Sequence, residues 1–182
     1  SLQMEVKFIP VSDYSAAVEA IVNRKVDLAW FGGLTFLQAY DRSGGRVEPI
    51  IQRIEDQSFR SVFITSDETI KSLRDLKGKK VMFGSQSSTS GHLMPRTFLM
   101  NEKIIPEKDF KRVAYSGAHD ATIAAVGSGK VQAGAMNIKT WKRFLREKRV
   151  PEGTKVFYTT PPYYNYNWTI HLDVPEKLRL KI

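Results

Sequence analysis

The sequence contains no cysteine among its 182 residues, which excludes a disulfide framework, a cysteine-based metal site and a thiol nucleophile. It also lacks any run of about 18 uncharged apolar residues, the length that a membrane-spanning helix needs. Its three histidines are dispersed without the spacing of metal ligands, so no zinc site and no cofactor are expected. No Walker loop, Gly-x-Ser-x-Gly elbow or regularly spaced carboxylate pair is present, and catalysis has little support.

Positive charge exceeds negative charge, because 28 Lys and Arg residues stand against 19 Asp and Glu residues and give a formal net charge of +9. Such an excess fits a nucleic acid, an anionic membrane surface or an anionic small ligand. The densest basic run, Lys139 to Arg149, lies on one expected helix and lacks the interleaved aromatic residues of a nucleic-acid platform. We therefore expect no nucleic-acid partner.

Strand and helix patterns alternate along the chain. Residues 4–9 alternate as a strand, and Ser12 or Asp13 then caps a helix with apolar residues at helical spacing. The further expected strands are residues 26–31, 47–54, 60–65, 80–83, 112–115, 131–136, 156–160 and 167–172. This alternation predicts an α/β fold with mostly parallel sheets, in which ligands bind beyond the carboxyl ends of the strands.

A polar loop follows the expected strand 80–83, and its residues 87–91 read Ser-Ser-Thr-Ser-Gly before a helix. The first backbone N–H groups of a helix have no intrahelical partner, and that helix end carries about half a positive charge. Hydroxyl and amide donors in this position can hold a tetrahedral oxyanion without a formal cation. A helix N-cap with more hydroxyl residues than capping requires explains the same residues equally well, because Ser and Thr favour that position.

Two further donors stand where a helix begins after a strand. His119 lies in the first turn of the helix after strand 112–115, where an imidazole can donate to an oxyanion and a bound anion would raise its pKa. The alternative is a surface histidine in a first helical turn. Tyr14 begins the first helix, and its alternative role is an aromatic staple. Together, hydroxyl, amide and imidazole donors are more typical of a ligand-binding site than of a catalytic site.

Five segments occur in the order and spacing of a known family. They are Ser12-Asp13-Tyr14, Val26-Asp27-Leu28-Ala29-Trp30, Ser88-Thr89-Ser90-Gly91, Gly117-Ala118-His119 and Val131 to Asn137. Through them, nearly the whole chain resembles the periplasmic phosphonate-binding proteins of ABC importers. Residues 91–96 and 159–168 most resemble the branch labelled as selenate transporter binding proteins. The resemblance implies an α/β type II periplasmic binding protein, with two doubly wound lobes that close around ligand like a hinge.

The resemblance also implies how the chain is divided. A first lobe would comprise residues 1–65 plus 160–182, and a second lobe residues 66–159, with the segment 159–164 as a stiff crossing between them. Family members begin with a further strand and helix and continue for several helices beyond the segment matched here. We therefore expect a chain truncated at both ends, with an incomplete first lobe.

The same resemblance implies the ligand site. The hydroxyl triplet and the histidine hold the phosphonate group, a first-lobe tyrosine falls on Tyr14, and a second family tyrosine falls on Phe59, which lacks the hydroxyl. In the family, an acidic residue recognises the amine of the ligand; its position corresponds to Lys139 here. The position of its Asp partner lies near Asn165 to Tyr166. The expected ligand-binding residues are Tyr14, Phe59, Ser88, Thr89, Ser90, His119, Lys139 and Tyr166.

Loss of the amine-reading carboxylates predicts a compact, fully anionic ligand such as phosphate, phosphite, selenate, sulfate or a small alkylphosphonate. Hydrogen phosphate also needs an acceptor for its proton, which Asp120 supplies unless it is an ordinary first-turn acid. The implied function is a non-enzymatic periplasmic receptor, or lipoprotein, that binds the oxyanion between its lobes and delivers it to an ABC permease. Contact with the membrane would come only through the permease or a lipid anchor. The alternatives are the ligand-sensing domain of a regulator or sensor kinase, and an enzyme acting on a phosphorylated small molecule.

Overall fold

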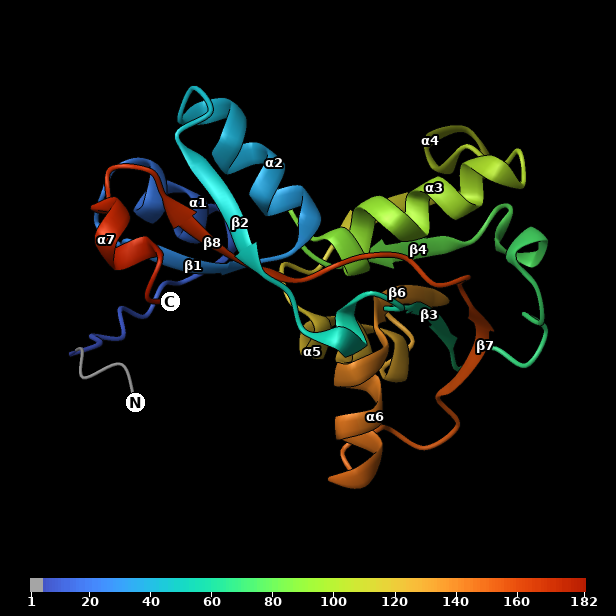
Figure 1. The fold of residues 1–182 in the computed structure, drawn as a ribbon. Helices are drawn as coiled ribbons and strands as arrows, with labels where there is room; N and C mark the ends of the chain where they lie inside the picture. The colour runs from blue at the N-terminus through green and yellow to red at the C-terminus, as the bar shows by residue number, and fades with distance from the viewer. Residues whose placement is uncertain (1–4) are drawn as a thin grey trace. The chain divides into compact units, whose positions relative to one another are not determined.

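The structure is a computed structural model that describes residues 5–182, and its chain forms two compact units (Figure 1). The first unit extends to Gln57 and resumes at Tyr164–Ile182, and the second unit is Ser58–Tyr163. The chain passes from the first unit to the second between residues 57 and 58, and it returns between residues 163 and 164. Residues 61–65, which we expected in the first lobe, form a strand of the second unit.

The first unit contains a three-stranded sheet of order β1-β8-β2, in which both strand pairs are antiparallel. Asp13 caps its first helix by accepting a hydrogen bond from the backbone N–H of Ala16 at 2.9 Å. A small apolar core joins α1, the sheet and α2 through Ile21, Phe31 and Ala39 respectively. The elements are α1 (Tyr14–Val22), β1 (Leu28–Phe31), α2 (Gly33–Arg42), β2 (Val47–Ile51), η1 (Ile54–Asp56), β8 (Asn167–His171) and α7 (Glu176–Arg179).

The second unit contains a five-stranded sheet of order β5-β4-β6-β3-β7. Strand β4 is parallel to both β5 and β6, whereas β3 is antiparallel to β6 and to β7. The elements are β3 (Ser61–Thr65), η2 (Leu73–Leu76), β4 (Lys80–Phe83), η3 (Thr89–Leu93), α3 (Met94–Asn101), α4 (Pro106–Asp109), β5 (Arg112–Tyr115), α5 (His119–Gly127), β6 (Ala133–Asn137), α6 (Ile138–Arg146) and β7 (Lys155–Thr159).

Helices cover both faces of this sheet, as Figure 1 shows for α3 on one face and α5 with α6 on the other. One face buries Phe63 and Leu99 in a cluster with η2 and α3. The opposite face buries Ile123 and Trp141, from α5 and α6, in a second cluster. The result is the three-layer α/β architecture that the alternating pattern predicts.

Two expectations about the strands were wrong. The first unit's sheet is antiparallel and the second unit's sheet is mixed, rather than mostly parallel, because β8 pairs antiparallel with β1 and β2 and β3 pairs antiparallel with β6 and β7. Strands β3 and β8 each follow a passage of the chain from the other unit and not a crossover helix. Residues 5–11 form no strand, since no strand of residues 5–182 pairs with them, and Val6 and Phe8 remain 83% and 85% exposed. Within residues 5–182, no helix has both the length and the apolar character to cross a membrane.

Candidate functional site

Most of the expected site residues lie at one edge of the second unit's sheet. Because β5, β4 and β6 are parallel, their carboxyl ends meet at this edge. The loop 84–91 follows β4, the turn 116–118 follows β5, and α6 begins directly after β6. The N–H of Ser116 donates to the carbonyl of Phe83 at 3.0 Å, which holds the turn against the loop.

The loop is closed by hydrogen bonds of its own backbone and of one serine. The N–H of Gly84 donates to the carbonyl of Gly91 at 2.8 Å, and the N–H of Leu93 donates to the carbonyl of Ser88 at 3.0 Å. Ser88 Oγ accepts from the N–H of Gly91 at 2.9 Å. Ser88 is therefore an N-cap, yet this bond uses only a lone pair and leaves the hydroxyl proton available to donate elsewhere.

The turn after the cap is a π-helix, η3, that continues without interruption into α3. Such turns are rare and are often found at functional sites. Ser88 and Ser90 are both only 1% exposed, and Thr89 between them is 6% exposed. The hydroxyl triplet is thus part of a buried, ordered turn rather than of a solvated loop.

The imidazole of His119 packs against this turn. A Cβ atom on Gly91 would lie 3.0 Å from His119 Cε1, 3.0 Å from Ser88 Oγ and 3.2 Å from the Cα of Gly84. A side chain on residue 91 would push at least one of these three groups aside, and their mutual approach places the histidine beside the hydroxyl triplet. Two segments that the sequence singled out separately therefore form one cluster.

The pKa of His119 is lowered to about 4, mainly by burial; the charge of Asp120 acts in the opposite direction, and Arg143 adds a smaller lowering effect. The ring is thus neutral near pH 7 in the unliganded protein, and a bound anion would raise its pKa. Ala118, the N-cap of α5, gives no side-chain hydrogen bond to the first turn. Asp120 is exposed, and its Oδ1 accepts the N–H of Ala121 at 2.9 Å, as in an ordinary first-turn acid.

A serine that the sequence analysis did not identify supports the triplet from a neighbouring strand. Ser61 Oγ lies 2.7 Å from the carbonyl of Ser90 and 2.6 Å from the hydroxyl of Tyr163. A carbonyl only accepts, so Ser61 donates to Ser90 and Tyr163 donates to Ser61. Ser61 and Tyr163 are 102 residues apart, and no local pattern relates them.

Phe59 and Lys139 lie together in the second unit. Phe59 is buried and bridges to Tyr163, and Lys139 Nζ lies 5.5 Å from the centre of the Phe59 ring. The N–H of Lys139 is capped by Asn137 Oδ1 at 2.6 Å, which fixes the first turn of α6. Lys139 therefore lies in the first turn of α6, at the edge where β6 ends.

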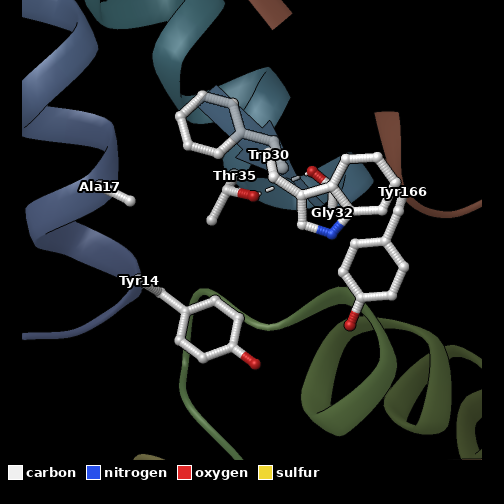
Figure 2. A pocket seen from close by; sticks show the side chains of 7 residues that line it. Tyr14, Ala17, Trp30, Gly32, Thr35 and Tyr166 are labelled. Atoms are coloured by element: carbon white, nitrogen blue, oxygen red, sulfur yellow. Dashed lines mark hydrogen bonds between the residues drawn. The ribbon is translucent and has the colours of Figure 1, made fainter. Parts of the chain in front are cut away.

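The other two expected residues, Tyr14 and Tyr166, line a pocket of about 290 Å³ in the first unit. Figure 2 shows their rings with that of Trp30 around the opening, while Thr35 Oγ1 donates to the carbonyl of Gly32 at 2.9 Å. Trp30 and Tyr166 stack with their ring centres 5.4 Å apart and an interplanar angle of 13°. The pocket walls are thus mainly aromatic.

Trp30 also contacts a cation. The guanidinium of Arg53 lies 4.5 Å from the centre of the Trp30 ring and donates to both carboxylate oxygens of buried Asp56, at 2.6 and 3.1 Å. The resemblance included Trp30 in a motif but gave it no role. Within the described part of the chain, no group of three His, Asp or Glu residues is arranged to hold a metal ion.

Comparison with known proteins gives one consistent result. All residues, 1–182, match the family model described as an ABC transporter, phosphonate, periplasmic substrate-binding protein. The chain is 40% identical, over 97% of its length, to the probable ABC transporter phosphite binding protein PhnD1 of Prochlorococcus marinus, and it spans 62% of that relative. It is 31% identical, over 71% of its length, to the phosphate-import protein PhnD of Mycolicibacterium smegmatis, of which it spans 44%.

Solved structures agree on the fold. The structure of Prochlorococcus marinus PhnD1 in complex with methylphosphonate matches with a TM-score of 0.85 and 39% identity, over 94% of this chain and 66% of that one. A binding protein component of an ABC phosphonate transporter from Pseudomonas aeruginosa matches with a TM-score of 0.79, at 24% identity and over 93% of this chain and 58% of that one, which bears on the fold alone. These matches confirm the type II periplasmic binding fold. The predicted nearness to the selenate branch stays a prediction.

Proposed function

Because the chain belongs to the family of periplasmic substrate-binding proteins of phosphonate ABC transporters, we propose that it binds a compact tetrahedral oxyanion and supplies it to an ABC permease. The observation that best supports this function is the approach of His119 to the turn of Ser88 and Gly91. Groups that can donate hydrogen bonds to an anion, namely the hydroxyls and amides of this turn and the imidazole, lie close together there. The proposed protein is a receptor and not an enzyme, and it works outside the cytoplasm.

In the proposed complex, Ser88, Thr89 and Ser90 donate hydroxyl or amide hydrogen bonds to the anion, and His119 donates from its ring. Hydrogen bonds to a charged acceptor contribute about 1.5–3 kcal/mol each, so a few of them hold an anion firmly at a buried site. The matches reported above are all solute-binding proteins and favour a receptor over the sensing domain of a regulator or kinase.

The proposed ligand is a small phosphonate, phosphite or phosphate, with selenate and sulfate as further members of the class. The relatives are named for phosphite and phosphate, and one is solved with methylphosphonate. Lys139 argues against a cationic tail, because its ammonium replaces the carboxylate that would pair with an amine. Tyr14 and Tyr166 remain ligand-binding candidates because they line the pocket of the first unit.

A binding panel tests the proposal. Calorimetry and thermal unfolding would compare phosphate, phosphite, methylphosphonate, aminoethylphosphonate, sulfate and selenate. A ligand at 100 times its dissociation constant stabilises the protein by about 2.7 kcal/mol, so a true ligand gives a plain shift. Ser90→Ala and His119→Ala should each remove most of that shift. Unchanged shifts in both variants would refute the assigned site, and tight binding of aminoethylphosphonate would refute the role given to Lys139.

A further inference from the structure

A second histidine, His92, lies on the π-turn directly after the hydroxyl triplet. Its Nδ1 is 2.8 Å from the carbonyl oxygen of Gln86, and its Nε2 is 3.2 Å from the hydroxyl of Tyr115. The ring also packs edge-on against Phe83 and against Tyr115, with ring centres 5.3 and 5.0 Å apart. The imidazole therefore connects β4, the loop and β5.

The two hydrogen bonds are compatible with one protonation pattern. A carbonyl oxygen only accepts, so His92 Nδ1 carries the proton and donates to Gln86. Nε2 of the neutral ring then accepts, and Tyr115 donates its hydroxyl proton to it. The Gln86 carbonyl thereby selects the tautomer of His92, and the Tyr115 hydroxyl, which can donate or accept, completes the pattern by donating to Nε2.

Burial keeps the His92 ring in its neutral form. Burial lowers the pKa of His92, and Arg96 lowers it further, while the bond to Gln86 and the charge of Glu107 act in the opposite direction. Arg96 and Glu107 are themselves an ion pair with an N–O distance of 2.5 Å. The ring is therefore neutral near pH 7, as the two hydrogen bonds require.

The bond from His92 to Gln86 spans the outer end of the loop. Gln86 stands two residues before Ser88, whose N–H donates to the carbonyl of Ser85 at 3.0 Å and whose Oγ caps the turn. Fixing the Gln86 carbonyl thus limits rotation of the peptide that leads into the hydroxyl triplet. Building on the proposed function, we propose that His92 is a positioning residue, held in one tautomer by the Gln86 carbonyl and anchored to β5 by Tyr115, that presents the Ser88–Ser90 donors to the oxyanion.

Three variants separate positioning from simple packing. His92→Ala removes the donor to Gln86, His92→Asn keeps an amide N–H near the position of Nδ1, and Tyr115→Phe keeps the ring packing but loses the hydroxyl. Loss of one neutral hydrogen bond corresponds to a roughly 2- to 10-fold weaker affinity. We expect that loss for methylphosphonate in His92→Ala and in Tyr115→Phe, and substantial recovery in His92→Asn. Equal affinity in wild type and His92→Ala would overturn the proposal.

Nitrogen NMR of the unliganded protein tests the tautomer without any ligand. We expect a proton on Nδ1 and a bare Nε2 in His92, the same tautomer in Tyr115→Phe because the Gln86 carbonyl still requires the Nδ1 proton, and faster amide exchange of Ser88 and Gly91 in His92→Ala. A wild-type ring protonated on Nε2, or unchanged exchange, would overturn the proposal. If the wild type binds no oxyanion of the panel, the proposed function fails, and the tautomer and exchange measurements still decide the role of His92 in ordering the loop.

Discussion

Replacing Gly91 by alanine places a methyl group where His119, Ser88 and Gly84 already meet. The added Cβ would lie 3.0 Å from two of these residues and 3.2 Å from the third. Gly84 cannot retreat, because its N–H holds the carbonyl of residue 91 at 2.8 Å. The clash is therefore relieved by displacement of His119 and of the Ser88 hydroxyl, the two groups assigned to the ligand.

Overpacking of this kind typically costs about 1–3 kcal/mol. If the displacement falls mainly on the ligand contacts, Gly91→Ala should weaken oxyanion binding by about 5- to 150-fold, since each 1.4 kcal/mol is tenfold in affinity. Isothermal titration with methylphosphonate and with phosphate measures the effect. Thermal unfolding without ligand reports how much of the cost falls on the fold itself.

Gly127→Ala is the matched control, because Gly127 is the last residue of the helix that His119 begins. Its Cβ would fall 2.3 Å from Pro151 Cγ, so this variant should also lose stability, but at the far end of α5. We expect the folded control to retain wild-type affinity. Wild-type affinity in Gly91→Ala, or an equal loss in both variants, would refute the packing argument.

Three further predictions follow from the same edge of the sheet. Ser61→Ala leaves the carbonyl of Ser90 and a tyrosine hydroxyl without their buried partner and should cost about 1–3 kcal/mol, measured as a lower urea midpoint with an unchanged slope. Because burial lowers the pKa of His119 to about 4 from an ordinary 6.5, protonation of this residue favours the unfolded chain. The free energy of unfolding without ligand should therefore fall by up to about 3 kcal/mol as the pH drops from 6.5 to 4. His119→Gln should lack this part of the pH dependence, and parallel stability–pH profiles of wild type and variant would contradict the prediction. Lys139→Glu reverses the local field and should shift preference from methylphosphonate toward aminoethylphosphonate by about 1–4 kcal/mol, whereas an unchanged ratio of their dissociation constants would exclude a role in selectivity.

Local patterns predicted the elements that carry the candidate site. The end of β4, the serine-rich turn and the start of α5 follow from apolar runs, caps and glycines, and their meeting at one edge follows from parallel pairing of β4 and β5. The contact between His119 and Gly91 is a detail of that meeting. Its distances depend on side-chain packing, which periodicity does not encode.

Other features depend on partners far away in the chain. The bond from Tyr163 to Ser61 joins the two ends of the second unit, and the antiparallel pairing of β3 depends on neighbours that local propensity does not reveal. Residues 5–11 alternate like a strand but form none, because no strand of the described chain pairs with them. The stacking of Arg53 on Trp30 and the tautomer of His92 likewise required the structure.

A crystal structure with methylphosphonate bound would test the central claim most directly. The account predicts that the phosphonate oxygens lie within hydrogen-bond distance of the Ser88 and Ser90 hydroxyls and of the His119 ring. A ligand bound at another place, with the turn of residues 87–91 not contacting it, would contradict the account.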